Sequence, residues 1–463
     1  MVTTYLFYVL LFTLATFLFF IFPIKLRKPF LIILGYGIYV WFSGVYALLL
    51  FGLTLICYFW GIYIESHKLK GKNILIIYLV FLSPLILLKY FHFNKVTNAI
   101  LNLEDFFLPL GISFFSFQML SYVLDINKGF IKSEKNIQNV LLHHAFFPIF
   151  FLGPIERAKN LFKQFNFDQP FNPKVFRDSL FLILWGIFKK IVISQSLFFV
   201  MSNIKKEIHF ANFWETLLLM SCSVFYIFID FSAYVDISKG AAKAFGIHIT
   251  KNIDDQVYLS TSRTELWRKW HISLTSWFRD YVFFPLSKRS SKLFYLYALI
   301  IIIYLLSGIW HDFTFNFFLW GFLNGFLIIL EQATKSRREI LWIRLRIIQY
   351  PKVILFSGWL SSFITGMVLN TLFLAPNLHQ SYLIIKGLWN FNEGTLYLGR
   401  RILLVVPFNL LILLGINHIK GKREVYELLP SNVYFRFGIY TFLVLITYYF
   451  ETPQTSKFLY GRF

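Results

Sequence analysis

Residues 293–311 read LFYLYALIIIIYLLSGIWH, a run of apolar side chains that ends on a histidine. A helix that crosses the hydrocarbon core of a bilayer takes about 20 predominantly apolar residues, so Leu293–Ile309 is predicted to span a membrane. Two shorter runs, Pro29–Phe42 and Leu141–Leu152, are predicted to be re-entrant or tilted. The other candidate spans are Tyr5–Phe22, Val45–Ile64, Asn73–Phe91, Phe106–Leu124, Val175–Val200, Phe213–Phe231, Phe315–Leu330, Val353–Leu374, Ile402–Ile416 and Tyr434–Phe450. We therefore predict an all-α polytopic membrane protein with about 11–13 membrane segments.

The composition supports this class. Of the 463 residues, 57% are hydrophobic, and the mean hydropathy is +0.62. Soluble globular chains contain about 45–50% apolar residues. The net charge of +22 does not indicate nucleic-acid binding, because the basic residues form short clusters between apolar runs. Four clusters are predicted to be cytoplasmic by the positive-inside rule, at Lys25–Lys28, Lys68–Lys72, Lys335–Arg346 and Lys420–Arg423.

No repeat or low-complexity linker divides the sequence, so residues 1–463 are expected to form one domain. The first apolar run lacks a preceding basic residue and a small-residue cleavage site, which predicts a retained helix. Cys57 and Cys222 lie in apolar segments and are expected to be small core residues. They form neither a disulfide framework nor a zinc-binding spacing.

The longest stretch without a predicted span is 250–292, and it contains the polar segment ELWRKWHISLTSWFRDY at 265–281. Its large apolar side chains recur at three- and four-residue steps, which predicts one amphipathic helix lying in the membrane interface. The members of this stripe are Trp267, Trp270, Leu274, Trp277 and Phe278. His271 is one position off the stripe. It can take part in catalysis, line a channel or contact an acyl donor, or simply pack.

His311 is the first candidate for catalysis. It lies between two apolar runs, so it is expected inside the helix bundle, where ionisable residues are functional candidates. Burial favours the neutral imidazole, which can accept a proton. The alternative is a histidine that only donates to a helix carbonyl.

Four charged residues near His271 are candidates for substrate or donor binding, namely Arg268, Lys269, Arg279 and Asp280. Arg268, Lys269 and Arg279 can meet the phosphates of a donor such as coenzyme A through charge-assisted hydrogen bonds. The alternatives are lipid headgroups or ion pairs with Glu265 and Asp280.

Two further motifs place acidic residues at the ends of apolar runs. Asp230 and Asp236 are six residues apart, so they do not share a helix face. No HExxH-type spacing accompanies them, and we expect no metal site. An ion pair with arginine or a helix cap is the favoured interpretation. Gly153–Arg157 (GPIER) predicts a helix end with an adjacent ion pair.

Taken in order, these segments resemble the membrane-bound O-acyltransferase family, and within it the branch of alginate O-acetyltransferases and teichoic-acid D-alanyl transfer proteins. The segments are LPLGISFF at 108–115, GPIER at 153–157, DFSAYVD at 230–236, WRKWHISL at 267–274, RDY at 279–281, GIWH at 308–311, Asn316 and Trp320-Gly321. The likeness covers about residues 30–330 and the extreme C-terminus.

The resemblance implies a ring of helices around a funnel and a tunnel. It also implies that His311 and His271 are the two family histidines. Trp310 and Asn316, in the surrounding motifs, are further candidates for substrate or donor binding. The expected reaction moves an acyl group, acetyl by preference, from a cytoplasmic acyl-CoA or acyl-carrier thioester to a hydroxyl of an exported polysaccharide or surface glycan. No bound cofactor is expected. The expected location is the inner membrane.

A serine-hydrolase-like partner is expected to complete the transfer, by resemblance. The rival interpretations are D-alanyl transfer to a teichoic-acid-like polymer and a non-enzymatic transporter or channel. Tyr460 in the terminal aromatic run can relay the acyl group, dock a partner or anchor the chain in the interface.

The sequence departs from the family pattern in two places. Asp312 replaces the usual glycine after His311 and is expected to favour the protonated imidazole or to orient its tautomer. Ser287–Ser290 replaces a glycine pair, which leaves that loop and the substrate open.

Overall fold

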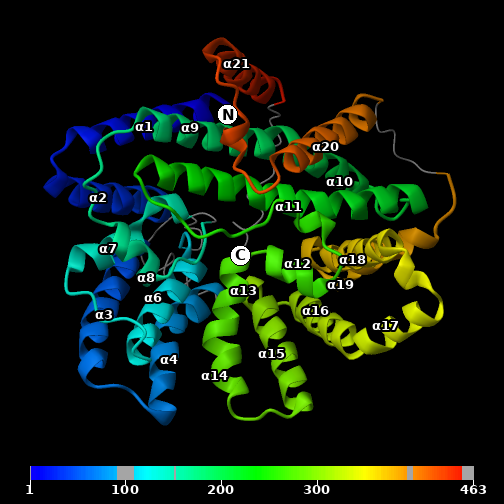
Figure 1. Cartoon of the computed structure of the whole chain (residues 1–463), viewed down its shortest axis with the longest axis horizontal. Coiled ribbons are helices and arrows are strands. Elements are labelled where there is room, and N and C mark those ends of the chain that lie inside the picture. Colours follow the sequence, from blue (N-terminus) through cyan, green and yellow to red (C-terminus); the bar gives the residue numbers. More distant parts are fainter. Residues whose placement is uncertain (1, 91–108, 151–152, 394–399, 451–463) are drawn as a thin grey trace. The chain divides into compact units, whose positions relative to one another are not determined.

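The computed structural model describes residues 2–90, 109–150, 153–393 and 400–450. Within these residues the secondary structure is helical, with no β-strand (Figure 1). The described chain divides into two compact units. Unit 1 comprises residues 2–185 and 234–251, and unit 2 comprises residues 186–233 and 252–450. The chain passes from one unit to the other within two of its helices, α9 (Pro173–Phe188) and α11 (Phe213–Ala244).

Unit 1 is built from α1 (Val2–Ile21), α2 (Ile24–Ser43), α3 (Tyr46–Ser66), α4 (Ile74–Leu85), α6 (Ile112–Asn127), α7 (Ile137–Ala145), α8 (Ala158–Leu161) and most of α9 (Pro173–Phe188). Unit 2 is built from α10 (Gln195–Lys206), most of α11 (Phe213–Ala244), α12 (Arg263–Lys269), α13 (Ile272–Phe278), α14 (Phe284–Ser287), α15 (Leu293–His311), α16 (Phe315–Ala333), α17 (Lys335–Arg344), α18 (Pro351–Leu374), α19 (Leu378–Lys386), α20 (Arg400–Lys420) and α21 (Val433–Tyr449). Shorter 3₁₀ and π turns are Gly71–Asn73, Ile86–Tyr90, Phe147–Ile149, Phe162–Gln164, Lys189–Ser194, Val257–Leu259, Arg279–Phe283, Ile347–Gln349, Gly387–Trp389 and Val425–Leu428.

In unit 1, α7 packs closely against α2. A Cβ atom at Gly35 of α2 would collide with the backbone carbonyl of Ala145, so this contact requires glycine. The buried Arg27 donates from its guanidinium to the carbonyl oxygens of Phe167 and Gln169, both at 2.8 Å. These bonds hold the 167–169 segment against α2, because a buried guanidinium needs acceptors.

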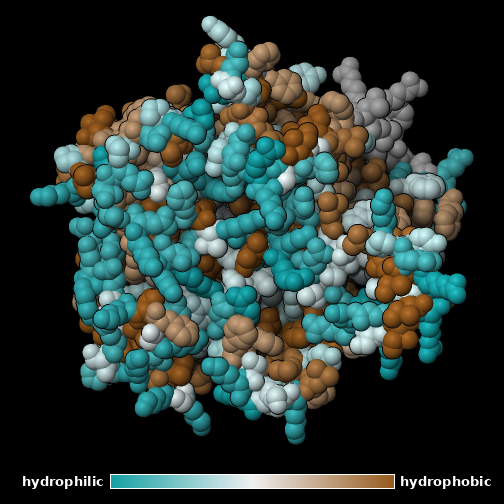
Figure 2. Space-filling model, in the orientation of Figure 1, coloured by the Kyte–Doolittle hydropathy of each residue, from teal (hydrophilic) through white to brown (hydrophobic). Residues whose placement is uncertain are grey.

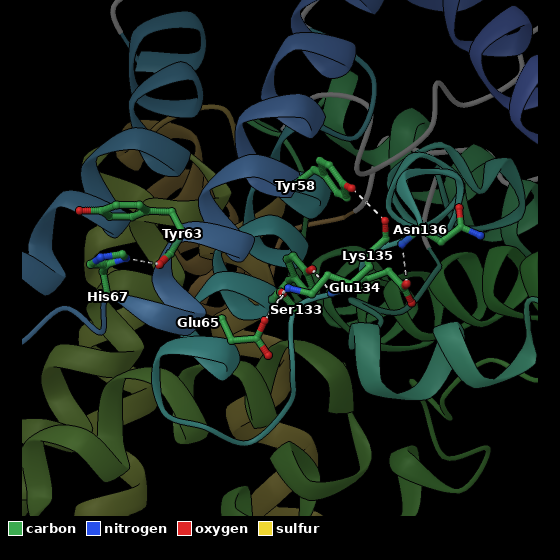
Figure 3. A network of polar contacts seen from close by, with 9 residues as sticks. Tyr58, Tyr63, Glu65, His67, Ser133, Glu134, Lys135 and Asn136 are labelled. Carbon is green, nitrogen blue, oxygen red and sulfur yellow. Dashed lines mark hydrogen bonds and ion pairs between the residues drawn. The ribbon is translucent and has the colours of Figure 1, made fainter.

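A polar network fixes the segment before α7 to the end of α3 (Figure 3). Glu65 accepts from the Ser133 hydroxyl at 2.5 Å and from the Lys135 ammonium at 2.7 Å. Tyr58 donates to the carbonyl of Lys135 at 2.8 Å. The carboxylate of Glu134 accepts from the backbone of Asn136 at 2.8 Å. Because several of these groups are exposed, the network defines the path of the chain more than it adds stability.

In unit 2, α15 and α16 form a hairpin with very close backbones. A Cβ atom at Gly308 would collide with the carbonyl oxygen of Phe317, and one at Gly321 would collide with that of Tyr304. Small residues at a helix interface allow this approach, which is a common packing device in membrane helices. The contact aligns the end of α15 with the first turns of α16.

Seven helical spans among the described residues are long and apolar enough to cross a membrane. They are Tyr46–Ser66, Gly71–Lys89, Pro173–Lys206, Phe213–Ala244, Leu293–His311, Phe315–Ala333 and Pro351–Leu374. Two shorter apolar helices, Phe7–Ile21 and Val433–Tyr449, accompany them. The protein is therefore an all-α, multi-pass membrane protein, as predicted.

Among the described residues the number of long apolar spans is smaller than the predicted 11–13 membrane segments, and some of the apolar runs do not form one long helix. The described part of the Phe106–Leu124 run turns at Gly111, in a left-handed conformation with φ 68°, before the 16-residue helix α6. The Leu141–Leu152 run supplies only the end of the nine-residue α7. Hydropathy measures transfer into lipid, but it does not detect such breaks.

Large apolar side chains are exposed on several of these helices, and hydrophobic side chains lie at the surface in Figure 2 as well. On α15 the exposed ones include Leu293, Phe294, Ile302 and Leu306. In a soluble protein such a surface would be a liability, but in a membrane it is the lipid-facing side. Cys57 and Cys222 are buried and free, as predicted.

The close α15–α16 contact can be tested with Gly321→Ala. The added methyl group must displace backbone, so we expect a loss of about 1–3 kcal/mol, measured as a lower thermal midpoint of the purified protein in detergent. Gly415→Ala on α20 is the matched control, since its Cβ would enter open space. Equal thermal midpoints for Gly321→Ala and the control would contradict the packing argument.

Candidate functional site

His311 is the last residue of α15 and is 3% exposed. Aromatic rings from three helices enclose its imidazole. The ring centroids of Trp310, Phe373, Trp320 and Phe317 lie 4.9, 5.0, 5.4 and 5.9 Å from that of His311. The site is therefore a buried aromatic enclosure at the tip of the hairpin, and the burial of His311 inside the bundle agrees with the prediction from the sequence.

Asn316 secures one wall of this enclosure. Its side-chain amide donates to the carbonyl oxygens of Leu372 at 3.3 Å and Ala375 at 3.1 Å. These bonds tie the start of α16 to the end of α18, where Phe373 lies. In this structure Asn316 thus positions an aromatic neighbour of His311, and its predicted role in substrate binding stays a prediction.

His271 lies at a helix break. The sequence predicted one continuous amphipathic helix here, and this was wrong: α12 ends at Lys269 and α13 begins at Ile272 (Figure 1). His271 adopts a left-handed backbone with φ 42°, which is uncommon for a residue with a side chain. Strain of this kind is of order 1–3 kcal/mol and persists only where the surroundings impose it.

Asn252 imposes the break. Its carbonyl accepts from the Ile272 backbone at 2.8 Å, and its side-chain oxygen accepts from the Ser273 backbone at 3.1 Å and hydroxyl at 2.8 Å. These donors at the start of α13 would otherwise lack partners. The apolar stripe packs largely inside the protein: Trp267, Leu274, Trp277 and Phe278 are buried, and Trp270 is half-buried.

The break turns the His271 ring inward, where it is 1% exposed. Its centroid lies 4.9 Å from that of Phe231 and 6.1 Å from that of Trp310. Trp310 also contacts His311, so one indole joins the two histidines. Burial lowers the pKa of His271 to about 3, so its ring is neutral at physiological pH.

A buried ion pair supports Phe231. The neighbouring Asp230 is 0% exposed and accepts from the Lys190 ammonium at 2.5 Å and the Ser194 hydroxyl at 2.7 Å. Both partners belong to the π-helical turn Lys189–Ser194. The predicted pairing of this aspartate with a basic residue is confirmed, although the partner is lysine and not arginine. The pair fixes the part of α11 that carries Phe231 against His271.

The predicted charged candidates lie at the edge of this region. Lys269 pairs with Glu265 at 2.7 Å, and Arg279 pairs with Asp280 at 2.8 Å, which is the alternative that the sequence left open. Arg268 is exposed. The structure therefore shows ion pairs at these positions, and donor binding by them stays a prediction.

The remaining sequence candidates fall in several places. The Asp312 carboxylate accepts from the backbone N–H of Phe313 at 2.8 Å, so it caps the turn after α15.

Glu156 in unit 1 is buried and accepts from the Thr250 backbone and hydroxyl. Tyr460 lies outside the described residues. Within the described ranges no group of three or more His, Cys, Asp or Glu side chains is arranged to hold a metal ion.

Sequence reasoning missed two contributors to the site. Nothing in the sequence marked Asn252 as part of the site, because a single asparagine in a polar loop resembles any turn residue. Phe373 was one of many phenylalanines in an apolar run, and only the fold brings it to His311.

The arrangement suits proton transfer. In its neutral form, an imidazole at the position of His311 can accept a proton from a hydroxyl group, which makes the hydroxyl oxygen nucleophilic. The neutral imidazole of His271, on the other side of Trp310, can accept or donate a hydrogen bond.

Comparisons with known proteins agree with this chemistry. The profile of the membrane-bound O-acyltransferase family matches residues 39–373. A probable alginate O-acetylase of Azotobacter vinelandii is 28% identical over 394 residues, which cover 82% of this chain and 76% of that protein. A peptidoglycan O-acetyltransferase of Helicobacter pylori is 25% identical, with 80% and 75% covered. A teichoic acid D-alanyltransferase of Streptococcus thermophilus is 25% identical, with 60% and 69% covered.

The buried, neutral His271 predicts a pH effect on stability. Its folded pKa of about 3 is below the value of about 6.5 expected in the unfolded chain. Between these values only the unfolded chain binds the proton, so stability is lost as the pH falls below about 6.5. The loss at pH 5.5 is about 1.4 kcal/mol for one such histidine.

The measurement is the thermal midpoint in detergent at pH 8 and pH 5.5. His271→Gln should lose less stability on acidification than the wild type, whereas exposed His379→Gln should behave as the wild type does. An unchanged pH dependence in His271→Gln would show that His271 does not titrate as argued.

Proposed function

Because the chain belongs to the membrane-bound O-acyltransferase family, we propose that it moves an acetyl group from a cytoplasmic thioester to a hydroxyl of an exported polysaccharide or surface glycan. The family match and the names of the relatives support an O-acyltransferase. The observation that carries the proposal is the enclosure of His311 by aromatic rings, with His271 joined to it through Trp310.

In the proposed reaction His311 acts as the general base. It takes the proton of the acceptor hydroxyl while the oxygen attacks the thioester carbonyl. An ester C–O bond forms and the C–S bond breaks. The proton then passes from the imidazole to the departing thiolate, so His311 returns to its neutral form. General base catalysis of this kind contributes about 10²–10⁴-fold to a rate.

His271 is proposed to hold the donor or the acceptor in place. Its left-handed backbone and its clamp by Asn252 fix the ring in one orientation. Pre-organised polar groups at the reacting carbonyl stabilise developing charge without rearranging during the reaction. His271 supplies one such group at the enclosure around Trp310.

Relatives named teichoic acid D-alanyltransferases support a second candidate, transfer of D-alanine to a teichoic-acid-like polymer. Acetyl transfer is preferred because the alginate and peptidoglycan O-acetyltransferases match more of the chain. Neighbouring genes discriminate the two: a serine-hydrolase-like partner favours acetylation, and an adenylating enzyme with a carrier protein favours D-alanine. The chain is an acyltransferase, so the interpretation as a transporter or channel is set aside.

The proposed setting is the inner membrane of a bacterium, with acyl-CoA or an acyl-carrier thioester as the donor and no resident cofactor. The glycan acceptor lies on the far side of the membrane. A serine-hydrolase-like protein there is the proposed partner that completes transfer.

The central test is His311→Ala, scored for acetyl ester on surface glycan in cells that express the full chain. Loss of the base should reduce ester content at least about 100-fold. His379→Gln, an exposed histidine in the same unit, is the control and should leave ester content unchanged. Normal ester content with normal amounts of His311→Ala protein would refute the assignment of His311.

The relay role of Tyr460 has its own test. Tyr460→Phe keeps the aromatic ring and removes the hydroxyl, so a covalent relay predicts loss of acetyl ester while the protein remains in the membrane. Ester content equal to that of the wild type would leave only docking or anchoring for this residue.

A further inference from the structure

Arg263 is a buried arginine that the proposed reaction does not use. It begins α12 and is 8% exposed. One guanidinium nitrogen, Nη2, donates to the side-chain oxygen of Asn324 at 2.6 Å. Its Nε is buried and has no hydrogen-bond acceptor among the described residues. An arginine carries five N–H donors, so this guanidinium is far from satisfied by one neutral amide.

The nearest protein carboxylate does not pair with this guanidinium. Glu331 of α16 accepts instead from the backbone N–H groups of Arg263 at 2.8 Å and Thr264 at 3.2 Å. Within the described residues Arg263 forms no salt bridge. Burial lowers the pKa of Arg263 to about 10, which still leaves it protonated near neutral pH. The Glu331 carboxylate acts on the guanidinium only through space, as a coulombic interaction that raises the pKa of Arg263. A buried guanidinium that forms no direct ion pair is costly, and such a group is expected to meet an anion.

The position of Arg263 connects it to the site. Asn324 also accepts from the Trp267 indole at 3.2 Å, and Trp267 packs on Trp320 with centroids 5.8 Å apart. Trp320 in turn contacts the ring of His311 at 5.4 Å. The side chain of Asn324 and the indoles of Trp267 and Trp320 therefore connect the guanidinium to the ring of the candidate base.

The position of Asn324 along α16 shows on which side of His311 the guanidinium lies. Phe317 contacts His311, and Asn324 follows Phe317 by seven residues, which is about 10 Å along the helix. This displacement is toward the end of α16 that meets the basic helix α17 (Lys335–Arg344). That end is cytoplasmic by the positive-inside rule. Arg263 thus lies on the side of His311 from which a cytoplasmic donor would approach.

We propose that Arg263 binds the phosphate of a phosphopantetheine thioester, the group that coenzyme A and acyl-carrier proteins share. This inference rests on the proposed function, and it names the recognition group for the donor. The guanidinium fork matches phosphate oxygens with parallel charge-assisted hydrogen bonds. The flexible pantetheine arm separates the phosphate from the sulfur, so the phosphate is expected at a distance from the reacting carbonyl.

The test compares two donors that differ only in the phosphate, S-acetyl-4′-phosphopantetheine and S-acetylpantetheine. Their dissociation constants are measured by calorimetry on the purified full-length protein in detergent. The wild type should bind the phosphorylated donor about ten- to hundredfold more tightly. Arg263→Gln should lose this preference while its affinity for S-acetylpantetheine stays within about twofold of the wild type.

Arg337→Gln is the matched control, since Arg337 is an exposed arginine on α17. It should keep the full preference for the phosphorylated donor. A variant Arg263→Gln that binds both donors equally weakly relative to the wild type would assign Arg263 a structural role and overturn the inference. An effect confined to the affinity for an anionic glycan acceptor would overturn it too.

A second variant tests the same inference if the Arg263→Gln protein does not fold. Asn324→Asp places a carboxylate where the amide oxygen now accepts from Arg263 and Trp267. This internal counter-ion should compete with the donor phosphate, so the preference for the phosphorylated donor should fall about tenfold or more. A full preference retained in a folded Asn324→Asp protein would contradict the inference.

The outcomes separate this inference from the proposed function. Binding does not require turnover, so a phosphate preference that depends on Arg263 would stand even if His311→Ala retained acetylation. Conversely, acetyl transfer that depends on His311, without any phosphate preference in the wild type, would preserve the proposed function and remove the role of Arg263.

Discussion

The close approach of α15 and α16 is the constraint on which the site depends. Gly308 and Gly321 remove the side chains that would hold the two backbones apart. In lipid there is no hydrophobic force between helices, so association relies on packing and on polar contacts. Because the backbones touch at Gly308, three residues before His311, the imidazole meets the rings at the start of α16 and cannot face lipid. The chemistry of the site is thus a consequence of helix packing.

A second constraint orients His271, and it is a break between two helices, not a close contact between them. α15 and α16 come together through small residues, whereas α12 and α13 are separated by a strained residue that a buried asparagine holds. Such strain is common at functional sites, where the surrounding structure keeps a side chain in an orientation that a regular helix would not allow. In a continuous helix His271 would lie at the edge of the apolar stripe. The break brings it to Trp310.

Buried charge in unit 2 falls into two kinds. The Lys190–Asp230 pair is neutralised within the protein, and its removal would leave a single buried charge, so it serves to fix the backbone beside Phe231. Arg263 is different, because among the described residues its guanidinium donates only to the neutral amide of Asn324 and forms no direct ion pair. A paired ion stabilises one arrangement of the protein. A buried arginine without a direct ion pair is suited to a ligand that brings an anion.

The sequence by itself determined the class, the ordered motifs and the two histidines, because hydropathy and residue order are local properties. Spans such as Leu293–His311 and the burial of His311 follow from the cost of placing polar groups in lipid. The tertiary structure alone decided that the helix breaks at His271, that Phe373 closes the enclosure, and that Arg263 faces an amide. These features depend on contacts between residues far apart in the chain, and no periodicity within one segment encodes which partner a buried side chain will meet.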